Sequence, residues 1–170
     1  MALFKISTDE AKQDKLFYVV ANIIIIDISR RVCLLLKRGN QEKVFPGKWG
    51  HAGGKLEHTD VRKLIVELGV QPIEGIDNIL GKLAVREAKE ECGLDVQEQS
   101  QILNNKVFIR PDGIPVVLVT MVCEYRGGEV VTEEGAITDH AWVTAEMLDA
   151  YDCIQGVKEE VVLAFSTFGI

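Results

Sequence analysis

The chain has 170 residues, a usual length for one domain, and 47% of them are hydrophobic, which is enough for a packed core. Its formal net charge of −7 argues against an extended nucleic-acid surface, because such a surface needs a positive face. A small anionic substrate remains compatible with this charge, because a metal ion can invert the local sign of a site. We expect a single domain spanning residues 1–170.

The cysteines and the N-terminal segment indicate a cytoplasmic protein. No two cysteines form a C-x-x-C pair, and with only three histidines the chain has no zinc spacing. Residues 1–15 are polar and mixed in charge, unlike a signal peptide. The most apolar run, Phe17–Ile26, is too short to span a bilayer, and its valines and isoleucines favour a buried strand. We therefore expect reduced thiols and no membrane partner.

The first half of the chain predicts two strands, Phe17–Asp27 and Val32–Lys37, followed by a glycine-rich loop over Arg38–Lys55. A short helix is expected over Val61–Leu68, with Gly69 as its end. A second helix is expected to begin at a cap on Asp77 and to run to about Cys92, before Gly93.

The second half predicts a further mixture of strands and helices. The expected elements are strands Lys106–Arg110 and Val116–Tyr125 around a turn at Pro111–Gly113, an extended stretch ending at Trp142–Val143, a short helix capped by Thr144, and a last helix over Val157–Phe165. Strands and helices mixed in one short chain predict a single sheet covered by helices, an α/β fold.

The strongest local pattern is acidic. The segment 80–94 reads L-G-K-L-A-V-R-E-A-K-E-E-C-G-L, and on a helix Glu87, Glu90 and Glu91 share an arc of roughly 100°. The same stripe is apolar toward the N-terminus, at Leu80 and Leu83. Three carboxylates beside a core repel one another, and a divalent cation would offset this cost. Oxygen ligands favour Mg²⁺ or Mn²⁺ over zinc. A solvated surface helix is the alternative when this segment is taken alone.

A second segment, 45–60, reads F-P-G-K-W-G-H-A-G-G-K-L-E-H-T-D. Together the two segments resemble the box of the Nudix hydrolase family, G-x5-E-x7-R-E-U-x-E-E-x-G-U, in which U is apolar. Gly54 matches the opening glycine and Asp60 the first acidic position, and the second half matches from Arg86 to Leu94. The resemblance implies an α/β/α sandwich with a mixed sheet.

The chain departs from the family pattern between the two halves of the box. Asp60 and Arg86 are 26 positions apart, whereas the family has eight, so residues 61–78 form an insertion. Asn78 lies eight positions before Arg86, so either Asp60 or Asn78 holds the first acidic position. Within the insertion, apolar residues recur at helical spacing from Val61 to Leu68. This stripe could pack on its own domain, cover the substrate or meet a second subunit. We expect packing on its own domain first and a homodimer contact second.

The resemblance also implies residue roles. Glu87, Glu90, Glu91 and the Gly54 backbone would bind the metal, and Arg86 would orient the glutamates. The expected further site residues are Glu134, with Glu133 as its alternative, for a later catalytic carboxylate. Substrate binding is expected from Arg38, His51, Gly53 and Gly54. Trp49 favours packing over base stacking.

The implied activity is Mg²⁺-dependent hydrolysis of a pyrophosphate bond in a nucleoside diphosphate linked to another group. The first expectation for this small nucleotide substrate is a nucleoside triphosphate, intact or oxidised. The alternatives are ADP-ribose or a nucleotide sugar, and a catalytically silent nucleotide-binding regulatory domain. The intact glutamate triplet argues against the silent domain.

Overall fold

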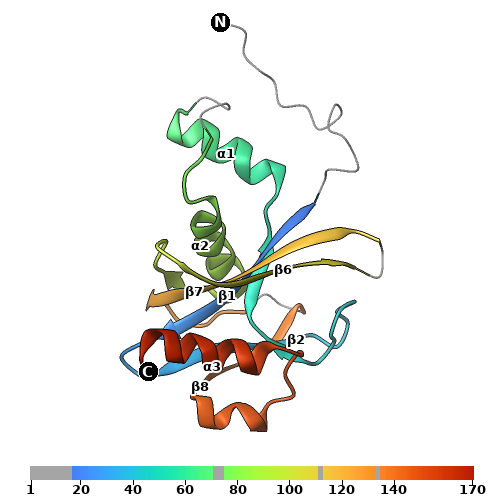
Figure 1. The fold of residues 1–170 in the computed structure, drawn as a ribbon, viewed down its shortest axis with the longest axis vertical. Helices are drawn as coiled ribbons and strands as arrows, with labels where there is room; N and C mark the ends of the chain where they lie inside the picture. The colour runs from blue at the N-terminus through green and yellow to red at the C-terminus, as the bar shows by residue number, and fades with distance from the viewer. Residues whose placement is uncertain (1–16, 71–74, 111–112, 133–134) are drawn as a thin grey trace, which may run out of the picture.

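The computed structural model describes residues 17–70, 75–110, 113–132 and 135–170, and within these ranges eight strands form one mixed sheet (Figure 1). The strands are β1 (Tyr18–Asp27), β2 (Val32–Arg38), β3 (Trp49–Gly50), β4 (Ala52–Lys55), β5 (Asp95–Val96), β6 (Gln101–Ile109), β7 (Pro115–Gly127) and β8 (Ile137–Val143). The order along the sheet is β3-β2-β1-β7-β5, with β4 beside β1, β6 beside β7 and β8 beside β2.

Strands β1 and β7 form the centre of the sheet and run parallel, whereas the other pairs are antiparallel. The isoleucines of β1 are fully buried and alternate between the two faces. Ile23 and Ile25 belong to the core on one face, and Ile24 and Ile26 to the core on the other. A strand buried on both faces reads as a continuous apolar run, which explains the hydrophobic segment in the sequence.

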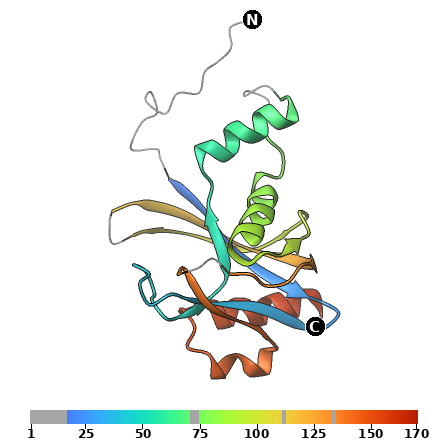
Figure 2. The same ribbon diagram turned by 180° about the vertical axis from the view of Figure 1, so that it is seen from behind.

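Helices cover both faces (Figures 1 and 2). On one face α2 (Ile79–Cys92) buries Leu83, Ala84 and Ala88 against the sheet. On the other face the 3-10 helix η3 (Ala145–Ala150) and α3 (Val157–Phe168) bury a second core. This arrangement confirms the predicted α/β/α sandwich with a mixed sheet.

The first predicted helix is α1 (His58–Leu68), which begins three residues earlier than expected. Glu57 and Asp60 form a capping box at its start, and Gly69 ends it in the left-handed conformation with φ 64°. No residue of α1 is buried, and the helix lies beyond α2 at one end of the molecule (Figure 1).

Other predicted elements and boundaries also differ from the structure. The stretch expected to be all loop contains β3 and β4, because β4 pairs with β1 and β3 pairs with β2. Strand β6 starts at Gln101 and not at Lys106, because pairing with β7 satisfies the backbone of residues 101–105, where a glutamine and two asparagines do not favour a strand. The residue that caps α2 is Asn78 and not Asp77.

Among the described residues, no helix combines the length and the apolar character needed to cross a bilayer.

Candidate active site

The three glutamates of α2 differ in their exposure to solvent. Glu87 is buried, with 7% of the residue exposed, whereas the Glu90 side chain is 60% exposed and Glu91 is half-buried. The spacing of the residues causes this difference in exposure. Glu87 lies on the face of α2 that packs on the sheet, and Glu90 lies toward the edge of that face. The acidic stripe is therefore neither fully solvated nor fully buried.

The backbone of the glycine pair approaches these carboxylates closely. The Gly53 N–H donates to Glu91 Oε2 at 2.9 Å. At Gly54 an added Cβ would lie only 1.9 Å from Glu87 Oε1, so any side chain there would displace the glutamate. The glycine pair thus lets a strand backbone and two carboxylates share one small space.

Arg86 connects the carboxylates. Its Nη1 donates to Glu90 Oε2 at 2.6 Å, and its Nη2 donates to Glu87 Oε1 at 2.7 Å. Nη2 also reaches Asp60 Oδ2 at 3.1 Å and the Lys55 carbonyl at 3.2 Å. One guanidinium therefore holds two glutamates of α2, the first turn of α1 and the end of β4 together.

The geometry separates the two candidates for the first acidic position. Asp60 pairs with Arg86, although 26 positions separate them. Asn78 lies at the start of α2, where its Nδ2 donates to Glu98, away from the glutamate triplet. The arrangement therefore favours Asp60 as the residue in that position. Sequence spacing could not decide this, because it does not show that the insertion returns to its starting point.

Electrostatics disfavour a charged Glu87 in the absence of a cation. Burial raises the pKa of Glu87 above its ordinary value, and the charges of Glu90 and Asp60 act in the same direction. The charge of Arg86 and its hydrogen bond oppose this rise. A carboxylate that is costly to ionise beside two other acids is stabilised by an added positive charge.

The donor chemistry of this cluster fits a hard divalent cation, because carboxylate and carbonyl oxygens are the ligands that Mg²⁺ prefers. As the side chains stand, no three Asp, Glu, His or Cys groups in the described part of the chain converge into a metal site. The contacts of Arg86 and Gly53 explain this, because they already hold carboxylate oxygens of all three glutamates.

The remaining predicted site residues lie elsewhere. Arg38 donates to the Glu42 carboxylate and the Val44 carbonyl in the loop that follows β2. Trp49 packs edge-on against Tyr151, with ring centroids 4.9 Å apart. The later carboxylates, Glu133 and Glu134, lie outside the described residues, as does the Pro111–Asp112 part of the predicted turn.

His51 belongs to a buried polar cluster on the opposite face of the sheet. Its side chain is 1% exposed, and Nε2 lies 3.3 Å from Glu160 Oε2 of α3. Thr120 Oγ1 donates to Glu160 at 3.2 Å, and Asn104 Nδ2 donates at 3.4 Å. Sequence reasoning missed Glu160, because an acid in the first turn of a helix usually faces solvent.

Comparison with known proteins defines the class of the chain. The NUDIX domain model matches residues 16–165. The chain is 30% identical over 128 residues to the nucleoside triphosphatase NudI of Klebsiella pneumoniae (strain 342), covering 70% of this chain and 77% of that protein. The class is thus that of the nucleotide pyrophosphohydrolases. The chain belongs to the Nudix hydrolase family, as the pattern of its box predicted.

Solved structures support the same fold. The crystal structure of a MutT NUDIX hydrolase from Burkholderia pseudomallei gives a TM-score of 0.62 at 18% identity, covering 88% of this chain and 98% of that one. The NUDIX domain of Shewanella oneidensis NrtR, complexed with ADP ribose, gives a TM-score of 0.66 at 14% identity, with 94% of each chain covered. At these identities the likeness concerns the fold.

Proposed function

We propose that this Nudix hydrolase cleaves a pyrophosphate bond of a nucleoside triphosphate, intact or oxidised, with Mg²⁺ held by Glu87, Glu90, Glu91 and the Gly54 carbonyl. The main support is the meeting of the glutamate helix with the glycine backbone at Gly53, where the Glu91 contact measures 2.9 Å. The choice of a triphosphate rests on the likeness to the Klebsiella nucleoside triphosphatase.

The reaction exchanges one bond to phosphorus for another. The oxygen of a water molecule bonds to one phosphorus, the bridging P–O bond breaks, and the bridging oxygen leaves with the other phosphate group. The water proton passes to a base. Bound Mg²⁺ supplies neutralisation of the phosphate oxygens and a lowered pKa of water, and Mn²⁺ fits the same donors.

The residues of the chain have separate tasks in this proposal. Arg86 orients Glu87 and Glu90, to which it donates at 2.7 and 2.6 Å. Glu134, or Glu133 in its place, supplies the later carboxylate as ligand or base. Arg38 and His51 remain proposed substrate contacts. Arg38 would have to exchange its bond with Glu42 for one to phosphate, and His51 is buried beside Glu160.

ADP-ribose and nucleotide sugars are the second substrate class. One similar structure contains ADP ribose, and another is described as an ADP-ribose pyrophosphatase from Streptococcus suis, with a TM-score of 0.58 at 19% identity, covering 89% of this chain and 92% of that one. A silent nucleotide-binding domain is the third candidate, and it would bind nucleotides without turnover. All three candidates require that the protein binds a small nucleotide. That the chain forms a single domain and that it makes a homodimer contact remain predictions.

The test is a substrate panel with Mg²⁺ and, separately, Mn²⁺. The panel contains the ordinary and oxidised nucleoside triphosphates, ADP-ribose and a nucleotide sugar, with products identified by ³¹P NMR. We expect triphosphates to give the highest kcat/KM. If ADP-ribose is cleaved in preference, the substrate belongs to the second class, ADP-ribose and nucleotide sugars. If nucleotides bind without any cleavage, the protein is not a hydrolase.

Substitutions of single glutamates examine the assigned residues. Glu91→Gln keeps an oxygen that accepts from the Gly53 N–H but removes a negative charge, so kcat should fall by roughly 10²-fold or more while the fold persists. Glu129→Gln changes an exposed glutamate and serves as the matched control. Full kcat in the Glu133→Ala, Glu134→Ala and double variants would remove that loop from the mechanism.

A further inference from the structure

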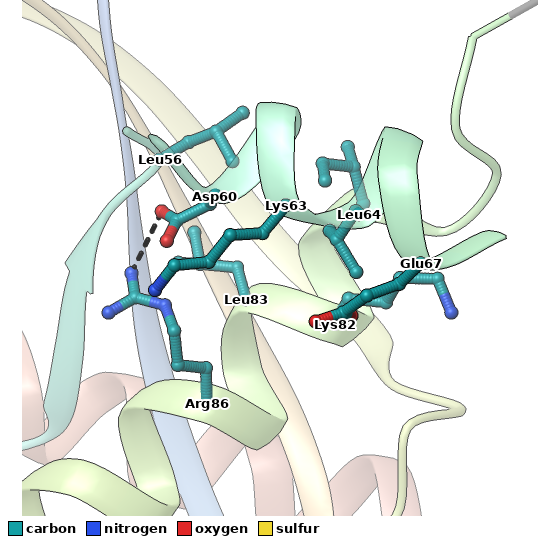
Figure 3. A pocket seen from close by; sticks show the side chains of 9 residues that line it. Leu56, Asp60, Lys63, Leu64, Glu67, Lys82, Leu83 and Arg86 are labelled. Carbon is teal, nitrogen blue, oxygen red and sulfur yellow. Dashed lines mark hydrogen bonds and ion pairs between the residues drawn. The ribbon is translucent and has the colours of Figure 1, made fainter. Parts of the chain in front are cut away.

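A cavity of about 220 Å³ lies between the inserted helix α1 and the N-terminal half of α2 (Figure 3). Its apolar lining consists of Leu56, Leu64, Ile79 and Leu83. Its charged lining consists of Asp60, Lys63, Glu67, Lys82 and Arg86. The cavity therefore combines apolar walls with a polar rim, which is the composition of a small-molecule site.

The insertion supplies the wall that makes this cavity. Leu64 lines it from α1, while Val66 on the same helix is 80% exposed and does not line it. The side chains of Lys63 and Glu67, one helical turn apart, extend from α1 toward α2 (Figure 3). A chain without the insertion would lack this wall.

The charges on the rim are largely balanced. Asp60 pairs with Arg86 at 3.1 Å, and Lys82 pairs with Glu98 at 2.9 Å. Lys63 and Glu67 then add one charge of each sign, from the same helix. Lys63 thus offers a donor and Glu67 an acceptor, which suits a neutral group with an acceptor and a donor on its edge.

Arg86 joins the cavity to the catalytic carboxylates. It lines the cavity and at the same time donates to Glu87 at 2.7 Å and to Glu90 at 2.6 Å. Its Nε is buried and has no hydrogen-bond partner among the described residues. A ligand in the cavity would thus adjoin the place where the phosphates react.

We propose that this cavity binds the nucleobase of the substrate, with the leucines against the ring and with Lys63 and Glu67 at its polar edge. The inference rests on the proposed function. A base is flat and apolar on its faces, whereas its edge carries adjacent donors and acceptors that lysine and glutamate recognise. The volume is below the usual range for a drug-sized ligand, so it suits one ring system and excludes a dinucleotide.

The first test fills the cavity. Leu64→Trp places an indole in it, and Val66→Trp places the same side chain on the exposed side of α1 as a control. We expect Leu64→Trp to raise KM for nucleoside triphosphates on the order of tenfold and to reduce discrimination among the four bases, with kcat retained. Val66→Trp should keep the wild-type constants. Wild-type KM and base preference in Leu64→Trp would overturn the proposal.

The second test changes the polar edge without changing the wall. Glu67→Gln keeps the length of its side chain, Lys63→Met shortens it by one atom, and both remove the charge. Each should alter the ratio of kcat/KM between bases and leave kcat unchanged, whereas a merely structural role would change all bases equally. Equal effects on all four bases would therefore count against base recognition, and circular dichroism would establish that α1 is intact.

A binding measurement separates this inference from the proposed function. Methyl-labelled protein would be titrated with guanosine and adenosine monophosphates, and we expect shifts at Ile79, Leu64 and Leu83 in the wild type and in Val66→Trp. If no triphosphate is hydrolysed but these methyls shift, the proposed function fails and the pocket stands. If triphosphates are hydrolysed and these methyls do not move, the pocket is refuted and the function stands.

Discussion

Asp60 and Arg86 are 26 positions apart in the sequence and form an ion pair of 3.1 Å. Asp60 lies in the first turn of α1, where its Oδ2 also accepts from the Glu57 N–H at 3.0 Å. Arg86 lies in the middle of α2. The pair therefore joins the helix of the insertion to the helix of the glutamates, so the two halves of the box meet despite the residues between them.

Replacing Arg86 with Ala should reduce both activity and stability. Loss of the guanidinium leaves the buried Glu87 without its 2.7 Å partner, at a cost of about 1–3 kcal/mol in the free energy of unfolding. Disordered carboxylates should lower kcat by about 10²-fold. Urea unfolding and steady-state kinetics measure these effects, and Arg62→Ala on the exposed face of α1 is the control. Wild-type kcat in Arg86→Ala would remove the proposed orienting role.

Gly54→Ala should abolish hydrolysis in a folded protein. The added Cβ would lie 1.9 Å from Glu87 Oε1 and 2.1 Å from its Cδ, so the carboxylate must move. Gly50→Ala is a matched control, since its Cβ would meet the end of the Ile154 side chain at 3.0 Å. Kinetics and a Mg²⁺ titration by calorimetry check the prediction. An active Gly54→Ala enzyme would mean that the position of Glu87 is not critical.

Glu160→Gln should make the stability of the protein less dependent on pH. Burial would raise the pKa of Glu160, but His51, Asn104 and Lys106 together lower it below its ordinary value of 4.5. A lowered folded-state pKa means that the ionised group stabilises the protein above pH 4.5 and that this contribution is lost as the pH falls through the folded-state pKa.

We therefore expect Glu160→Gln to unfold about 1–3 kcal/mol more easily at pH 7, with a difference from the wild type that shrinks in acid. Urea unfolding from pH 7 down to pH 3 measures this, and Glu159→Gln, its exposed neighbour on α3, should follow the wild type. A difference in the free energy of unfolding that stays constant from pH 7 to pH 3 would contradict the lowered pKa of Glu160 in the folded state.

Replacing residues 61–78 with a short Gly/Ser turn should leave a folded enzyme. Helix α1 has no buried residue and contributes none to the two cores, so its removal should leave both cores packed. Asp60 remains in this variant and can still pair with Arg86. We expect retained Mg²⁺ binding with an altered substrate profile. An unfolded product would identify the insertion as core structure, and an unchanged profile would identify it as a passive addition.

The spacing of residues along the chain determined the main elements. The isoleucines of β1 predicted a strand buried on both faces, and the interval from Glu87 to Glu91 placed the acids on one helix arc. These patterns are visible in a sequence because strand and helix repeats are local. The match of the box to a known family then predicted the sandwich fold.

Only the tertiary structure decided which groups meet across long intervals. The pairing of Asp60 and not Asn78 with Arg86, the burial of Glu160 beside His51, and the start of β6 at Gln101 all depend on contacts between distant segments. The cavity beside α1 has the same origin, because one wall comes from the insertion and the other from α2. A local pattern specifies an element and its apolar face, whereas the partner of that face depends on how the whole chain packs.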